Sequence, residues 1–440
     1  MSQQLQRSLG LTALTLIAVG GCIGSGIFKS PSAVADYLRD PTLILAVWGL
    51  GGLIALSGAL TLAETGSMFP KAGGIYVYIK EAFGELTAFL YGWTILAVSN
   101  TGSIAALVIT FAHYVGFIIP IGDRGELLLS ITAIVVVTFA NLFGARAGGT
   151  LAGVFTSLKL MGIIVIILAG LFMAGIPMFE NVSEIASVGA KDKGPISAFG
   201  LALISVLWAY GGWQHASMLS GEAKNPSRNI PLAMVLGAFI VTVVYMLTNV
   251  AYLQMLPIDQ MAATKTVAAD AMSQKFSWGG NFVAALIAIS TFGTASIYCL
   301  SAPRIYFAMA NDGLFFKSMA QLHPKYQVPV NAILIQSAWA IVLLLLWGTF
   351  EDLITYVEFI DYIFFMLAGI SMLILRRKMP NAERPYRTWG YPVVPLFFVL
   401  VIGWFISNTL IEKPLESLAG VAVLLVGVPL FYLFKRQQKP

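Results

Sequence analysis

Residues 11–28, LTALTLIAVGGCIGSGIF, are apolar and long enough to enter a lipid bilayer as a helix. Within this stretch, however, Gly20, Gly21, Gly24 and Gly26 follow one another closely. Each glycine in a helix interior costs about 1 kcal/mol relative to alanine. The stretch therefore predicts a membrane helix that is interrupted near its middle.

The composition shows that this segment belongs to a membrane protein. Of the 440 residues, 58% are hydrophobic and 11% are charged, whereas about 25% are charged in ordinary soluble domains. Apolar stretches of roughly 20 residues recur along the whole chain, as transmembrane helices require. We therefore predict an all-α polytopic membrane protein with twelve transmembrane helices. The predicted spans are 9–36, 42–67, 86–119, 126–145, 151–175, 196–221, 229–256, 279–309, 330–348, 352–375, 391–411 and 415–434.

The basic residues predict the orientation of the chain. With the N-terminus in the cytoplasm, most of the 26 Lys and Arg residues fall in cytoplasmic loops, including a cluster between Arg376 and Arg387. Because cytoplasmic loops carry an excess of Lys and Arg, both termini are predicted to face the cytoplasm, in a cell (inner) membrane. The net charge of +5 follows from this topology, and such scattered basic residues do not indicate a nucleic-acid partner.

A second predicted span is interrupted in the same way as the first. The motif WAYGGW at 208–213 has paired glycines in mid-span, about 190 residues after the first break, and later spans recur at a similar offset. The chain is therefore predicted to contain two five-helix repeats, 1–175 and 196–375, and two additional helices in 391–434. Because each repeat crosses the membrane an odd number of times, the second repeat has the inverted orientation. An inverted repeat with a broken first helix in each half is typical of secondary transporters.

The interruptions have a physical explanation. Peptide groups without partners cost several kcal/mol each in hydrocarbon, so they are tolerated where a solute satisfies them. The amides at the start of the half-helix near Ser25 suit a carboxylate, and the carbonyl groups near Trp208 suit an ammonium group. Together the two breaks predict a site for a zwitterion. Close helix packing, as in small-xxx-small motifs, is the alternative, but two breaks in matching positions favour the binding site.

The motifs GGCIGSGIF, WAYGGW and GEAKNPSRNIP resemble those of the amino acid–polyamine–organocation superfamily, and so do the segments 63–84 and 301–329. The resemblance covers essentially the whole chain and is strongest for the L-type amino-acid transporter branch and its bacterial homologues. It implies a leucine-transporter type fold with discontinuous helices 1 and 6. It also implies sodium-independent transport of amino acids by alternating access, often as obligatory exchange (antiport).

The resemblance also implies which residues bind the substrate. The positions that match the carboxylate site of the family are Ile23, Gly24, Ser25 and Gly26, and those that match its amino-group site are Trp208, Ala209 and Gly211. The large indole of Trp208 favours small or medium neutral substrates. Members that carry cationic substrates tend to have a carboxylate where this chain has Gly211, which argues against arginine or lysine as the main substrate.

Lys159 lies inside the fifth span without an acidic neighbour in the sequence. An ionisable group within a membrane is a functional candidate, although its side chain could instead reach the cytoplasmic interface. Family members carry a matching lysine, which implies that the ammonium group takes the place of a sodium ion between Gly20 and Thr294. If Lys159 stays charged, it is a fixed cation and transport needs no sodium. If Lys159 binds and releases a proton, with Tyr245 as a hydroxyl partner, the protein is a proton-coupled amino-acid symporter.

Four further residues in or beside the spans are noted. Lys29 could extend into the outer vestibule or attract an acidic side chain, and we favour the former. His215 is expected to be a packing residue, with pH sensing as the alternative. Glu358 and Asp361 lie three residues apart on one helix face, and we favour a structural role over the lining of a path.

Several classes of protein are excluded. The three histidines are too scattered for a metal site, and no nucleotide-binding G-x-x-x-x-G-K motif occurs, so no enzyme, metal or cofactor is expected. Short polar patches do not provide the continuous path of a channel. The loop 118–127 lacks the cysteine through which eukaryotic members bind a single-span glycoprotein, so no disulfide-linked heavy chain is expected. The predicted partners are amino-acid substrates and the lipid bilayer.

Overall fold

The computed structural model describes residues 5–173, 194–346 and 350–436, without the side chains of 173, 350–358 and 416. Within these ranges the regular structure is helical, apart from one isolated bridge between Leu9 and Ala223. The helices are α1 Leu11–Cys22, α2 Gly26–Leu38, α3 Pro41–Met68, α4 Ile75–Phe83, α5 Glu85–Thr94, α6 Asn100–Ile118, α7 Gly122–Leu142, α8 Ala145–Met173, α9 Pro195–Tyr210, α10 His215–Met218, α11 Pro226–Met255, α12 Ile258–Ala263, α13 Val267–Ser273, α14 Gly279–Ser301, α15 Pro303–Asn311, α16 Val330–Leu346, α17 Phe350–Lys378, α18 Val393–Glu412 and α19 Pro414–Arg436.

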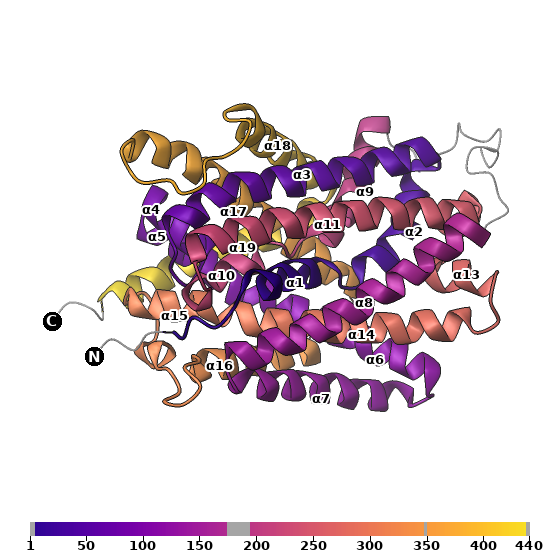
Figure 1. Cartoon of the computed structure of the whole chain (residues 1–440), viewed down its shortest axis with the longest axis horizontal. Helices are drawn as coiled ribbons and strands as arrows, with labels where there is room; N and C mark the ends of the chain where they lie inside the picture. Colours follow the sequence, from indigo (N-terminus) through magenta and orange to yellow (C-terminus); the bar gives the residue numbers. More distant parts are fainter. Residues whose placement is uncertain (1–4, 174–193, 347–349, 437–440) are drawn as a thin grey trace.

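The long helices run roughly along one direction, and the start of α1 lies at the same end of the molecule as the end of α19 (Figure 1). Ten segments of the described chain are long and apolar enough to cross a membrane, with α1 and α2 counted as one segment and α14 and α15 as another. The shorter apolar helices α9 and α16 coincide with the predicted spans six and nine. The prediction of an all-helical, multi-pass membrane protein is therefore confirmed.

Local sequence determines where several helices begin. At the start of α3 the side chain of Asp40 accepts a hydrogen bond from the amide of Leu43, and Pro41 occupies the first turn. Proline suits this position because its missing N–H would have no partner inside the helix. Pro195 and Pro226 begin α9 and α11 in the same way. These signals allow long apolar helices to begin at defined residues.

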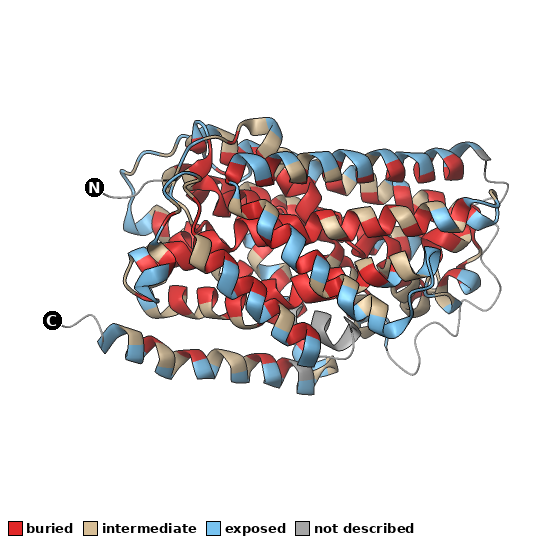
Figure 2. Cartoon of the chain, turned by 90° about the horizontal axis from the view of Figure 1, so that it is seen from below, coloured by how far each residue is buried: buried red, intermediate tan, exposed pale blue. Residues whose placement is uncertain are grey.

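The helices differ in how deeply they are buried. In the most apolar window of α1 and α2, 72% of the residues are buried inside the protein, against 28% for α18 and 22% for α19. Figure 2 shows buried residues concentrated in the centre of the bundle and exposed residues along its outer helices. The interrupted helix formed by α1 and α2 therefore lies in the interior, whereas the last two helices lie on the periphery.

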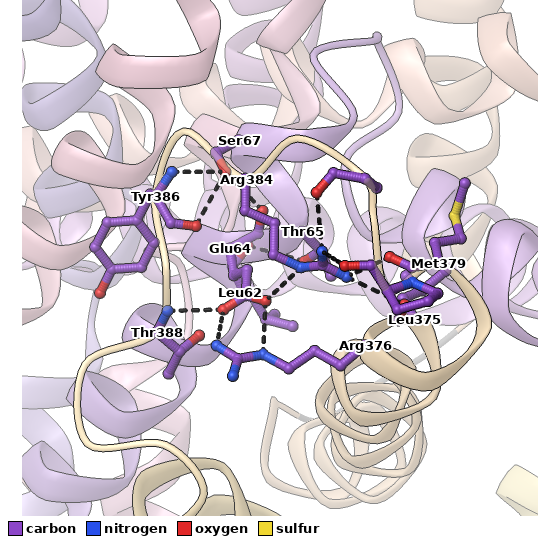
Figure 3. Close-up of polar contacts among 12 residues, drawn as sticks. Leu62, Glu64, Thr65, Ser67, Leu375, Arg376, Met379, Arg384, Tyr386 and Thr388 are labelled. Carbon is purple, nitrogen blue, oxygen red and sulfur yellow. Dashed lines mark hydrogen bonds and ion pairs between the residues drawn. The ribbon is translucent and has the colours of Figure 1, made fainter.

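A buried carboxylate joins two distant parts of the chain at the end of α3 (Figure 3). Glu64 accepts hydrogen bonds from the guanidinium of Arg376 at 2.8 and 2.6 Å and from that of Arg384 at 3.2 Å. The amide of Thr388 donates to the same carboxylate at 2.7 Å. Because paired charges and a peptide amide surround it, Glu64 fixes α3 to the end of α17 and to the loop that precedes α18.

Candidate functional site

The two interrupted helices meet at their breaks. Helix α1 ends at Cys22 and α2 begins at Gly26, while α9 ends at Tyr210 and α10 begins at His215. The backbone of Gly212 has φ +134°, and a Cβ atom there would lie 2.2 Å from the carbonyl carbon of Gly21. The contact between the two breaks therefore depends on glycine, both for the backbone conformation and for the space.

The start of α2 presents polar groups that have no hydrogen-bond partner within the described part of the chain. The amides of Phe28 and Lys29 close the first turn on the carbonyl oxygen of Ser25, so the amides of Gly26 and Ile27 stand at the open end of the helix. The hydroxyl of Ser25 is buried and has no hydrogen-bond partner among the described residues. This end of α2 has the polarity and the free donors that bind anions such as a carboxylate.

The carbonyl groups of the first break are bound by a buried lysine side chain. Lys159 on α8 is fully buried, and its ammonium group donates to the carbonyl oxygens of Gly20, at 2.7 Å, and of Ile23. It also donates to the hydroxyl of Thr294 at 2.8 Å. The hydroxyl of Ser290 donates to the carbonyl of Ile23 at 2.9 Å. Lys159 thus replaces the hydrogen bonds that the interruption of the helix removes.

Tyr245 on α11 joins the two breaks directly. Its hydroxyl lies 2.9 Å from the carbonyl oxygen of Cys22 and 2.9 Å from that of Ala209. The thiol of Cys22 donates to the carbonyl of Tyr210 at 3.4 Å. These contacts hold the end of α1 against the end of α9, so the two breaks form one rigid unit on this side.

A small cavity lies between the two breaks and the helices α6 and α14. Its volume is about 10 Å³, room for about one water molecule. The lining residues are Gly21, Cys22, Gly24, Ser25, Gly26, Ser103, Leu107, Trp208, Gly211, Thr294 and Tyr298. We call this space the central cavity. It combines the open end of α2 with an aromatic side chain on the opposite wall.

Known proteins are similar to this sequence along nearly its full length. The family model "Amino acid permease" matches residues 9–429. The chain belongs to the amino acid permease family. It is 32% identical to the serine/threonine exchanger SteT of Bacillus subtilis, over 99% of this chain and 98% of that protein.

Mammalian transporters are similar to this permease as well. The b(0,+)-type amino acid transporter 1 of Mus musculus is 32% identical over 98% of this chain and 88% of its own length. The Asc-type amino acid transporter 1 of the same species is 29% identical over 98% of this chain and 81% of its own length. This permease is therefore a member of the amino acid–polyamine–organocation superfamily, in the L-type branch with its bacterial homologues, and its relatives are transporters rather than enzymes.

The structure brings most of the predicted site residues of this permease together. Gly24, Ser25, Gly26, Trp208 and Gly211 line the central cavity. Two predicted binding residues do not line it. They are Ile23, whose carbonyl accepts from Lys159, and Ala209, whose carbonyl accepts from Tyr245.

Sequence reasoning missed the opposite wall of the cavity. Ser103 and Leu107 reach it from α6, and Tyr298 reaches it from α14. The polar run SNTGS at 99–103 within an apolar span was a signal that could have indicated α6. Nothing comparable marks Tyr298.

Lys29 and His215, which the sequence also singled out, do not line the central cavity. Lys29 on α2 lies 3.5 Å from the hydroxyl of Thr110 and 5.9 Å from the ring centre of Tyr114, both on α6. His215 is buried, with its Nδ1 atom 2.6 Å from the hydroxyl of Ser301. The side chain of Glu358 lies outside the described part of the structure.

Proposed function

We propose that this permease is a secondary active transporter that exchanges small or medium neutral L-amino acids without sodium, by alternating access. The observation that carries the proposal is the meeting of two broken helices around Ser25, where free amides face a cavity. An aligned relative over nearly the whole chain is a serine/threonine exchanger. Small hydroxylated or aliphatic amino acids are therefore the first substrates to test.

The proposal includes a leucine-transporter type fold. It consists of twelve transmembrane helices, with an inverted five-helix repeat in 1–175 and 196–375 and two additional helices in 391–434. Two observations support it. The two interruptions, α1 to α2 and α9 to α10, begin corresponding parts of the sequence, and α18 and α19 are the peripheral helices. We also propose that both termini face the cytoplasm and that the membrane is the inner membrane. Arg376 and Arg384 lie near the end of the bundle where the chain ends, and basic residues favour the cytoplasmic side.

At the site, the substrate carboxylate is proposed to bind the amides and the hydroxyl at Gly24, Ser25 and Gly26, next to the carbonyl of Ile23. The amino group is proposed to bind the backbone around Trp208, Ala209 and Gly211. The polarity supports this orientation, since the N-terminal end of α2 favours an anion and the C-terminal end of α9 favours a cation. The indole of Trp208 then covers the bound amino acid.

A central cavity of about 10 Å³ is smaller than any amino acid. Substrate entry therefore requires α2, the side chain of Trp208 or the facing walls of α6 and α14 to move. Such a requirement is consistent with alternating access, in which the breaks stay together while surrounding helices open first to one side and then to the other.

The position of Lys159 supports exchange over proton coupling. Its ammonium group is surrounded by the oxygen atoms of Gly20, Ile23 and Thr294, an arrangement that resembles the coordination of a small cation. A fixed cation at this position makes sodium unnecessary. The proton-coupled symporter, in which Lys159 is the titrating group and Tyr245 its hydroxyl partner, is the alternative that the experiment must separate.

Counterflow in proteoliposomes tests the proposal. Vesicles are preloaded with one unlabelled amino acid at a time, and entry of the same labelled amino acid is measured with and without sodium and with and without a proton gradient. Exchange predicts entry that requires an internal amino acid and ignores both ions. Entry into empty vesicles that is driven by a proton gradient would instead establish the symporter, and no entry of any amino acid would exclude both functions.

A further inference from the structure

A second cavity lies next to the central cavity. Its volume is about 20 Å³, and it shares Ser103 and Tyr298 with the central cavity. Residues that line the second cavity but not the central cavity include Tyr91 on α5, His215 on α10 and Asp361 on α17. Because α5 and α10 lie on the side of the molecule where α1 begins and α19 ends (Figure 1), this cavity lies between the central cavity and that end of the bundle.

Three polar atoms around the second cavity lack hydrogen bonds. They are the hydroxyl of Tyr91, the hydroxyl of Ser99 and the Oδ1 atom of Asp361, all buried and without a hydrogen-bond partner among the described residues. No lysine or arginine of the described part of the chain lines the cavity. A carboxylate in a membrane interior without a cation or a full set of donors is costly, and such groups usually mark functional sites.

The backbone beside this cavity is also irregular. Residues Ile95–Ser99, between α5 and α6, form a π-helix. The amide of Asn100 donates to the carbonyl of Ile95, and the hydroxyl of Thr101 lies 2.7 Å from the carbonyl of Leu96, five residues earlier. A π-turn inside a helix weakens its hydrogen bonding and frequently occurs at a functional site. Here it places Ile95, Ser99 and Asn100 on the cavity wall.

We propose that the second cavity is a binding site for a small cationic group, with Asp361 as its counter-charge and the hydroxyls of Tyr91 and Ser99 as additional ligands. The substrate's ammonium group is the nearest source of such a group, because the two cavities share the wall formed by Ser103 and Tyr298. The second cavity would then be a transient site on the path toward the end of the bundle that carries the termini. This inference rests on the proposed function.

The other groups around Asp361 are compatible with a cation. His215 is held through its Nδ1 atom by Ser301 on α14, and its ring lies 4.1 Å from that of Tyr298. The side-chain amide of Asn100 donates to the carbonyl of Tyr298 at 3.3 Å. Both groups are therefore occupied by neighbours, which leaves Asp361 as the anion of the site.

The test compares the full-length protein with Asp361→Asn in proteoliposomes of known orientation. The half-saturating concentration of a neutral amino acid is measured separately from each side of the membrane. We expect it to rise about tenfold from the side of the termini, the effect of losing one charge-assisted hydrogen bond, and to change less than about twofold from the other side. Asp259→Asn is the matched control, because Asp259 is an exposed acid. It pairs with Arg39, at the end of α2 that points away from the central cavity.

Ion replacement separates the two sources of the cation. The measurement is repeated with choline in place of internal sodium and potassium, and at internal pH 6 and 8. If the wild-type constants do not change, the substrate's ammonium group is the occupant. If they change and Asp361→Asn abolishes that dependence, the occupant is a free cation or a proton. Each result supports a cation site when it accompanies the side-specific shift of Asp361→Asn.

Two results would overturn the inference. The first is identical half-saturation of the wild type and Asp361→Asn from both sides with the same ion response. The second is an equal loss of rate from both sides with unchanged half-saturation, as expected if the cavity merely holds a structural water. If Asp361→Asn does not fold, Tyr91→Phe and Ser99→Ala replace it, with an expected side-specific shift of about threefold, and a shift from neither side would count against the site. A wild type that performs no exchange would instead refute the proposed function.

Discussion

Lys159 and Glu64 are both ionisable, buried and bonded to distant parts of the chain, yet their surroundings differ. Glu64 is paired with two guanidinium groups and a peptide amide, so its negative charge is balanced by opposite charge. Lys159 is surrounded by neutral oxygen atoms of a broken helix and has no carboxylate partner among the described residues. The first arrangement ties helices together. The second joins the broken helix to α8 and α14 at the site where the two breaks meet.

The largest expected effect is on Lys159. Replacement by methionine, Lys159→Met, removes the ammonium group that bridges the carbonyl groups of Gly20 and Ile23, and leaves these carbonyls only the hydroxyl groups of Thr294 and Ser290 as donors. We expect exchange to fall more than about 100-fold, measured as counterflow per correctly inserted molecule. If Lys159→Met retained near wild-type exchange, the ammonium group would have no role in holding the break.

Adding a side chain where the backbones of the two breaks touch should have the next largest effect. Gly212→Ala places a methyl group against the backbone of Gly21 at a position with φ +134°, which is unfavourable both for space and for conformation. We expect at least about a tenfold loss of exchange. Gly194→Ala is the control, because a Cβ atom there would meet nothing within 4 Å. Equal activity of both variants would show that the breaks need not touch.

A different outcome is expected for Glu64. Glu64→Gln removes one charge of a buried ion pair and leaves Arg376 and Arg384 without their counter-charge, which typically lowers stability by about 3 kcal/mol. The thermal unfolding temperature in detergent should therefore fall, while exchange per folded molecule stays within about twofold of the wild type. A loss of exchange without a loss of stability would place Glu64 in the transport machinery.

The smallest expected loss of free energy follows from removing the hydroxyl that joins the two breaks. Tyr245→Phe removes hydrogen bonds to the carbonyl groups of Cys22 and Ala209 and keeps the packing of the ring, a loss of about 1 to 2 kcal/mol. We expect exchange to fall severalfold, without any change in its dependence on pH. If the variant instead changed the pH dependence, the proton-coupled alternative would gain support.

The sequence predicted the features that depend on residue type at one position. Glycines at 20–26 and 211–212 predicted the two breaks, and a lysine within an apolar span predicted a buried cation. The contacts made by Glu64 were not predictable, because Arg376 and Arg384 are more than 300 residues away. The π-helix at Ile95–Ser99 was also missed. Its sequence, ILAVS, contains neither the glycine nor the proline that usually marks an irregular helix.

The central claim is that the open end of α2 and the facing break bind the two charged ends of one amino acid. Competition measures it most directly, with a transported amino acid, its methyl ester and its N-acetyl derivative as inhibitors of labelled exchange. The account predicts that the free amino acid inhibits at least about 100-fold more strongly than either derivative, since each derivative lacks one charged end. Equal inhibition by the methyl ester would contradict it, because the amides at Ser25 and Gly26 would then bind no carboxylate.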